Sequence, residues 1–169
     1  MTVDGVEDGV ETDIRALVED ERRSWGEFQA LLACLSPEQA ERPGYFLEGW
    51  SAKDLLAHVA GWLAEAGLVL EQIRVGTFDG KDMDIEGMNA VFLEANRPQP
   101  VRVVHTEASA SRSRLMQEVG LLVGLPRGAP QGAGSFTVEA DRWLRKAGPE
   151  HYAEHLPRLR EWVKELMIG

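Results

Sequence analysis

The stretch GWSAKDLLAHVAGW, residues 49–62, contains the clearest start of a helix in this chain. Ser51 and Asp54 fit the capping pattern in which a Ser side chain and an acidic side chain three residues later bind each other's backbone amides. The apolar side chains that follow recur at intervals of three and four: Leu55, Val59, Trp62, Leu63, Ala66 and Leu70. This spacing predicts an amphipathic helix from Ser51 to near Gly76, with His58 on its apolar stripe.

The rest of the chain also carries helical spacing. We expect long helices over residues 11–34, 101–123, 135–147 and 149–167, and short ones near residues 36–41 and 85–95. Residues 101–104 include three β-branched side chains and would suit a short strand, but the spacing that follows favours a helix from residue 101. Pro157 lies inside the last helix and is expected to kink it.

The predicted fold class is all-α. About 25 residues separate the second and third main helices, which is long enough for both to run in the same direction. We therefore expect a four-helix bundle with a long crossover between helices two and three. Residues 1–10 are predicted to form a flexible tail, and residues 11–169 a single domain.

Composition excludes several classes of partner. The formal net charge of −10 and the lack of a basic stripe argue against nucleic acid. No apolar run reaches the roughly 18–20 residues that span a bilayer, so a membrane is not expected. The single cysteine, Cys34, has no partner for an internal disulfide, which favours a reducing, cytoplasmic location. We expect Cys34 to be a small buried hydrophobic residue.

Three of the four histidines suit a metal site. His151 and His155 are four residues apart, so both project from one face of the last helix. His58 from the second helix would complete a set of three nitrogen ligands with open positions for water or substrate. Imidazole ligands suit zinc, nickel, iron and copper alike. The alternative is that the pair is partly exposed and His58 is an ordinary core histidine.

Neighbouring residues are candidates for the rest of a site. Glu154 could act as a general base, and Asp54 or Glu154 could orient an imidazole, although either could equally be surface charge. Trp50, Trp62 and Tyr152 are candidate pocket walls, with core packing as the alternative. The sequence HYAEH, residues 151–155, also matches the H-x-x-E-H peptidase signature. We do not favour a peptidase, because only 14 residues follow His155 to supply another ligand.

The stretch at residues 49–62, together with HYAEHLPRLREW at residues 151–162, resembles the DinB/YfiT-like superfamily. The start of the first stretch is also similar to the ClbS/DfsB branch and to the mycothiol-dependent maleylpyruvate isomerase branch. The histidine pair at residues 151 and 155 separates this chain from ClbS-type proteins. The isomerases usually carry a further C-terminal domain, which this sequence does not contain.

The resemblance implies a crossed four-helix bundle, commonly a homodimer. It also implies a divalent metal ion, often zinc or nickel, held by His58, His151 and His155. The function that it implies is a metal-dependent enzyme that transfers a low-molecular-weight thiol to a small electrophilic substrate, or hydrolyses that substrate. The alternatives are a non-catalytic protein that binds or sequesters a small toxic molecule, and a scaffold with a residual histidine set.

Overall fold

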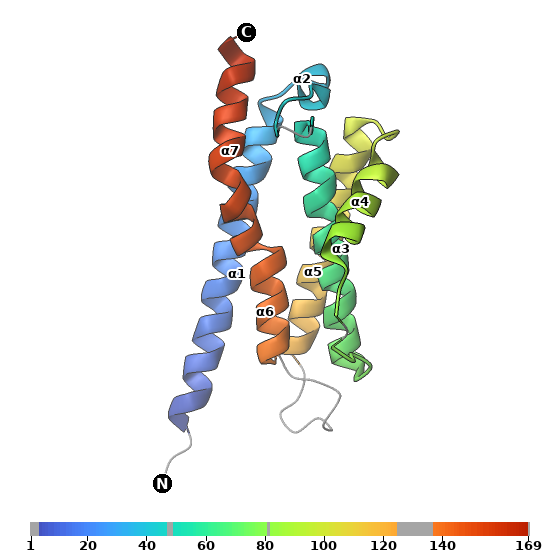
Figure 1. The fold of residues 1–169 in the computed structure, drawn as a ribbon. Coiled ribbons are helices and arrows are strands. Elements are labelled where there is room, and N and C mark those ends of the chain that lie inside the picture. The colour runs from blue at the N-terminus through green and yellow to red at the C-terminus, as the bar shows by residue number, and fades with distance from the viewer. Residues whose placement is uncertain (1–3, 47–48, 81, 125–136, 169) are drawn as a thin grey trace.

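A computed structural model describes residues 4–46, 49–80, 82–124 and 137–168, and all secondary structure in these ranges is helical (Figure 1). The order of elements is α1 (Asp4–Ala33), α2 (Pro37–Glu41), α3 (Ala52–Val75), α4 (Ile85–Asn96), α5 (Val101–Val123), α6 (Val138–Ala147) and α7 (Pro149–Ile168). No helix in the described ranges is both long enough and apolar enough to cross a membrane. The all-α prediction is confirmed for this part of the chain.

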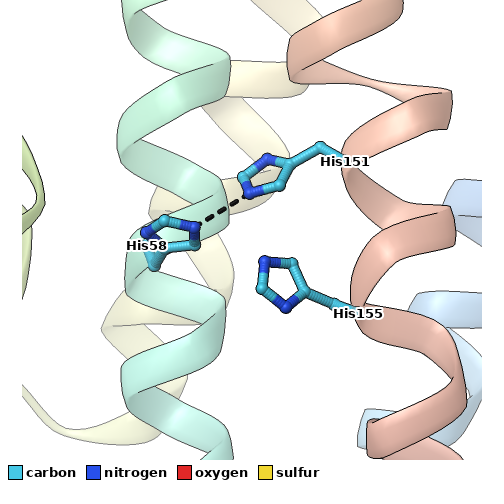
Figure 2. Close-up of side chains that lie close together, drawn as sticks. All are labelled: His58, His151 and His155. Atoms are coloured by element: carbon cyan, nitrogen blue, oxygen red, sulfur yellow. Dashed lines mark hydrogen bonds between the residues drawn. The ribbon is translucent and has the colours of Figure 1, made fainter. Parts of the chain in front are cut away.

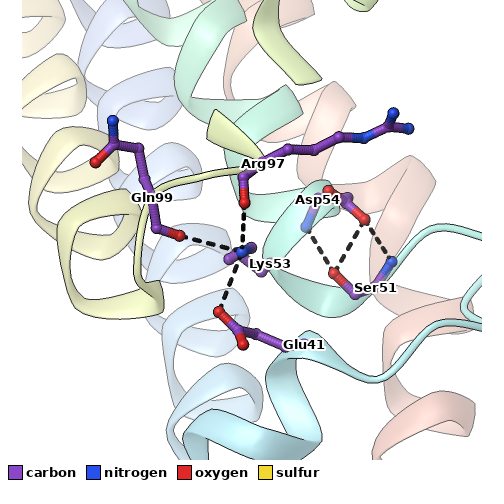
Figure 3. A network of polar contacts seen from close by, with 6 residues as sticks. All are labelled: Glu41, Ser51, Lys53, Asp54, Arg97 and Gln99. Atoms are coloured by element: carbon purple, nitrogen blue, oxygen red, sulfur yellow. Dashed lines mark hydrogen bonds and ion pairs between the residues drawn. The ribbon is translucent and has the colours of Figure 1, made fainter. Parts of the chain in front are cut away.

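Helix α3 begins with the predicted capping box. The Ser51 side chain accepts a hydrogen bond from the Asp54 amide at 3.2 Å, and the Asp54 carboxylate accepts one from the Ser51 amide at 2.9 Å (Figure 3). The same first turn is also held by Lys53, whose ammonium group donates to the Glu41 carboxylate and to the carbonyl oxygens of Arg97 and Gln99, each at 3.1 Å. These bonds join the start of α3 to α2 and to the connection between α4 and α5.

The long helices pack in two parallel pairs. Helices α3 and α5 make the most extensive contact in the molecule. Lys53 at the start of α3 lies beside the start of α5, and Arg74 at the end of α3 pairs with Glu118 near the end of α5, so the two helices run in the same direction. Helices α1 and α7 are likewise parallel to each other and run opposite to α3 and α5 (Figure 1).

Helix α4 lies close against α3 because Gly61 leaves room for the Phe92 ring. A Cβ atom placed on Gly61 would lie 2.3 Å from that ring, which no real packing allows. Helices α6 and α7 follow each other directly in the chain, as one column separated only by Gly148. A Cβ atom placed on Gly148 would lie 2.8 Å from the Leu144 carbonyl oxygen. These two glycines therefore set where α4 and α7 can lie.

Several boundaries differ from the sequence predictions. Helix α1 starts at Asp4, so residues 4–10, expected to form a loose tail, are helical. Helix α5 includes residues 101–104, as the helical alternative expected. The predicted start of α6 at residues 135–136 lies outside the described residues. Helix α7 continues through Pro157.

The burial predicted for Cys34 is wrong. Its side chain is exposed at the end of α1, where the thiol donates to the Ala30 carbonyl. The first residues after a helix lie at its frayed end, so an apolar run leading up to a helix end does not guarantee that the next residue is covered.

Candidate metal centre

Three imidazole rings meet between α3 and α7. His58 projects from α3, and His151 and His155 project from successive turns of α7 (Figure 2). The Nε2 atoms of His58 and His151 are 2.9 Å apart, and the ring centroids are separated by 4.8–5.3 Å within the set. One ring nitrogen from each residue can be chosen so that all three lie within 4.8 Å of one another. We call this set the histidine cluster.

Local structure explains how the cluster forms. His58 lies one turn after the capping box of α3, whose position is fixed by the bonds of Lys53. Helix α7 starts immediately after the break at Gly148, and its rotation about its own axis is set on the far side by the Tyr152 hydroxyl, which donates to Glu21 of α1 at 3.1 Å. The i, i+4 spacing then places both α7 histidines on the face toward α3.

Burial keeps the cluster neutral near pH 7. The three side chains are only 8–9% exposed. Burial lowers the pKa of His58 to about 4 and that of His151 to about 3, and it also lowers the pKa of His155. Neutral imidazole is the form that binds a metal ion, so no proton has to be displaced at neutral pH.

The hydrogen bonding of the cluster is incomplete. Between the two facing Nε2 atoms one nitrogen donates and the other accepts, which assigns opposite tautomers to His58 and His151. The Nδ1 atoms of both rings are buried without a partner at hydrogen-bond geometry, although the Asn89 side chain lies close to His58 and the Ala147 carbonyl lies close to His151. Buried polar atoms are usually paired. Three neutral imidazoles whose ring nitrogens can lie within 4.8 Å of one another could hold a divalent metal ion.

The cluster forms one wall of a cavity of about 720 Å³. This volume lies within the range of roughly 300–1,000 Å³ that is usual for small-molecule sites. Trp50, Trp62 and the exposed Glu154 all line it. The cavity therefore brings the three histidines together with two of the three candidate walls and the candidate base.

Two candidates lie elsewhere. Tyr152 is fully buried on the opposite side of α7, between α1 and the core, and does not line the cavity. Its assignment as a pocket wall therefore does not fit the structure, because its hydroxyl is bound to Glu21 and its ring packs on Phe28 and Trp25. Asp54 is used by the capping box and does not line the cavity.

Other lining residues were missed by the sequence analysis. Asn89 of α4 accepts a hydrogen bond from the Trp62 indole N–H at 2.8 Å and faces the cavity. Helix α6 contributes five further lining residues: Glu139, Arg142, Trp143, Lys146 and Ala147. The sequence analysis predicted a helix here, but no spacing in the sequence shows that its edge borders a cavity.

Fold and site together define an all-helical protein with three histidines that could hold a metal ion at a small-molecule cavity. The family model described as "Mycothiol maleylpyruvate isomerase N-terminal domain" matches residues 22–123, and the chain belongs to this family. No curated protein and no solved structure matches the chain significantly. The matched part contains His58, whereas His151 and His155 lie beyond it.

Proposed function

We propose that this chain is a metal-dependent enzyme that transfers a low-molecular-weight thiol to a small electrophile. The observation that carries the proposal is the convergence of three neutral imidazoles, whose ring nitrogens can lie within 4.8 Å of one another, on a cavity of ligand size. The family description, which names mycothiol, favours a thiol as co-substrate over other nucleophiles.

His58, His151 and His155 would hold the metal ion. When bound, a divalent ion would lower the pKa of a thiol or a water molecule placed beside it. The aromatic side chains of the cavity would keep bulk water away from the reacting atoms. Glu154, exposed at the cavity wall and adjacent to His155, would accept the proton that the thiol loses as its sulfur adds to an unsaturated carbon of the electrophile. The π bond at that carbon breaks, and its electron pair takes up the proton from Glu154.

Hydrolysis is the second candidate reaction, and the position of Glu154 favours it. A carboxylate on the cavity wall next to three metal-binding histidines could equally take a proton from water. The two reactions share one site and differ only in the nucleophile. They are separated by supplying the electrophile with and without a thiol and comparing the products.

Several finer features belong to the same proposal. The packing of α1, α3, α5 and the α6–α7 column supports a four-helix bundle in which α4 lies within the crossover from α3 to α5. The all-imidazole ligand set supports zinc or nickel. Assembly as a homodimer and a cytoplasmic location rest on the family resemblance and on the single cysteine.

Metal content tests the proposal first. Protein prepared without an affinity tag should contain close to one zinc or nickel ion per chain by elemental analysis, and His155→Ala should contain almost none. His105→Ala is the matched control, since His105 lies on α5 outside the cluster, and it should keep the metal. Equal metal content in all three proteins would contradict the assignment of the site.

Activity is tested next with thiols and model electrophiles. The enzyme proposal expects thiol consumption that depends on the metal and falls in Glu154→Gln while the metal stays bound. Stoichiometric binding of the electrophile without turnover, unchanged after metal removal, would instead support the non-catalytic binding or sequestration protein.

A further inference from the structure

Aromatic side chains surround the histidine cluster on several sides. Five of the residues that line the cavity are aromatic: Phe46, Trp50, Trp62, Phe78 and Trp143. They come from the segment before α3, from α3 itself, from the segment after α3 and from α6. Trp50 begins this wall directly at the cluster, because its ring centroid is 5.4 Å from that of His58. We call these five residues the aromatic wall.

The Trp62 ring is held in one orientation. Its indole N–H donates to Asn89 at 2.8 Å, and its ring meets the edge of Phe92 at a centroid distance of 5.7 Å and an angle of 85°. Both partners belong to α4, which the close contact between Gly61 and Phe92 keeps against α3. The ring is therefore fixed before any ligand arrives, so little conformational entropy is lost on binding.

The rings before α3 are also fixed. Phe46 contacts Tyr45 and Trp50 edge to face, at centroid distances of 4.5 and 5.5 Å. Arg158 of α7 donates to the carbonyl oxygens of Tyr45 and Gly44 at 2.8 and 3.3 Å. These bonds hold the residues just before α3 against α7, on the same side as His155.

Charge gives the cavity little selectivity. Among its described lining residues, Arg142 and Lys146 are cationic, whereas Asp82, Glu139 and Glu154 are anionic. Arg142 is already paired with Glu139. The two signs nearly balance, so neither a strongly anionic nor a strongly cationic ligand finds a complementary field. The fixed aromatic faces are the feature that distinguishes this cavity.

We infer that the cavity selects uncharged small molecules that carry an aromatic or similarly flat conjugated ring. The ring would pack against the faces of Trp62 and Trp50, where offset or edge contacts between aromatic rings add to the effect of buried area. This inference rests on the proposed function in that it places the reactive end of the ring beside the histidine cluster. Binding of the ring itself needs no metal.

The test compares two uncharged alcohols by isothermal titration calorimetry: 2-naphthalenemethanol and its fully saturated decahydro analogue. The saturated compound is the more hydrophobic of the two. A cavity that binds ligands through hydrophobicity alone would therefore bind it at least as tightly as the aromatic alcohol. We expect the aromatic alcohol to bind about tenfold more tightly. This ratio corresponds to the extra binding free energy of about one contact between aromatic rings. Equal affinities, or tighter binding of the saturated compound, would overturn the inference.

Variants locate the effect. Trp62→Leu should weaken binding of the naphthalene compound about tenfold while leaving the saturated analogue nearly unchanged. Trp25→Leu is the matched control, because Trp25 is a partly buried tryptophan that packs on Phe28 and Tyr152 outside the cavity. Circular dichroism establishes that both variants are folded, and Trp50→Leu replaces Trp62→Leu if the latter is not. An equal loss in the control would also overturn the inference.

The experiment is run on metal-free and on zinc-loaded protein. Ring-selective binding in both forms supports the inference whether or not the metal assignment holds. A failed metal assignment appears separately, as unchanged metal content in His155→Ala. The two proposals can therefore fail independently.

Discussion

Helix α7 has a buried polar cluster on each side, and the two differ in how far their polar atoms are satisfied. On the side of α1, the Glu21 carboxylate accepts hydrogen bonds from Arg112 at 2.8 and 2.6 Å and from the Tyr152 hydroxyl at 3.1 Å. On the side of α3, the histidine cluster contains one ring-to-ring hydrogen bond, and the Nδ1 atoms of His58 and His151 have no partner at hydrogen-bond geometry. We call the Glu21, Arg112 and Tyr152 set the acidic cluster.

We interpret the cluster whose polar atoms are satisfied as structural, and the histidine cluster as a candidate binding site. Glu21 is fully buried, and the acidic cluster borders no described cavity. Its three members come from α1, α5 and α7, so its bonds hold these helices in register. The histidine cluster is also buried but borders a cavity, and its three ring nitrogens could hold a metal ion. A closed set of bonds stabilises the fold, and an open one next to a cavity indicates a binding site.

The largest expected effect on the unfolding free energy comes from disrupting the acidic cluster. Glu21→Ala leaves Arg112 and Tyr152 without their acceptor inside the protein, and loss of one partner of a buried pair typically costs about 3–5 kcal/mol of unfolding free energy. Urea denaturation measures this. Glu19→Ala, which breaks the exposed pair of Glu19 with Arg22 on the same helix, should cost less than about 1 kcal/mol. Comparable losses in the two variants would mean that the acidic cluster does not hold the helices together.

The second-largest effect on the unfolding free energy concerns the histidine cluster and appears only when metal is added. At a free zinc concentration about 100 times Kd, binding to the folded state alone raises the unfolding free energy by about 2.7 kcal/mol. Thermal or urea unfolding with and without zinc should show this gain in the wild type. It should be absent in His155→Ala and preserved in His105→Ala. A gain that survives in His155→Ala would place the ion elsewhere.

A third effect distinguishes the clusters by pH in metal-free protein. In the folded state burial lowers the pKa of His58 to about 4 and that of His151 to about 3, whereas histidine in an unfolded chain titrates near pH 6.5. The unfolded state therefore binds more protons below pH 6.5. Stability from these residues is complete above that pH and falls with decreasing pH, by about 1.4 kcal/mol per pH unit for each histidine until its folded pKa is reached.

Urea denaturation with a chelator present at pH 7 and pH 5 measures this slope. His58→Leu removes one titrating group, so its loss of stability between the two pH values should be about 2 kcal/mol smaller than that of the wild type. The same loss in both proteins would show that His58 titrates alike in the folded and unfolded states.

Local sequence rules predicted most of the helices and the histidine cluster. The capping box of Ser51 and Asp54 fixes the start of α3 through contacts between residues three apart, and the i, i+4 spacing fixes the shared face of His151 and His155. These features depend on helix geometry alone. Closeness of His58 to α7 is a tertiary property. It was predicted because the apolar stripe indicated which side of α3 faces inward and because the family resemblance implied the same three histidines.

The errors arise where tertiary packing decides between equivalent positions. With 3.6 residues per turn, Tyr152 and Glu154 flank the line joining His151 and His155 on opposite sides, each about 60–100° from the two histidines. Spacing therefore cannot tell which flank faces the cavity. Packing of α1 against one flank buries Tyr152 and leaves Glu154 on the cavity wall. Glu21 was not singled out either, because its partners Arg112 and Tyr152 are 91 and 131 residues away.

The smallest effect tests that correction directly. Tyr152→Phe removes one hydrogen bond to Glu21, which keeps its two bonds from Arg112, so the unfolding free energy should fall by only about 1 kcal/mol. Zinc affinity and binding of 2-naphthalenemethanol should both stay within about twofold, since such changes correspond to less than about 0.5 kcal/mol. Urea denaturation and calorimetric titration of the same sample measure all three quantities. A large loss of ligand affinity with little loss of stability would mean that Tyr152 contacts the ligand after all. The distinction between the two sides of α7 would then be wrong.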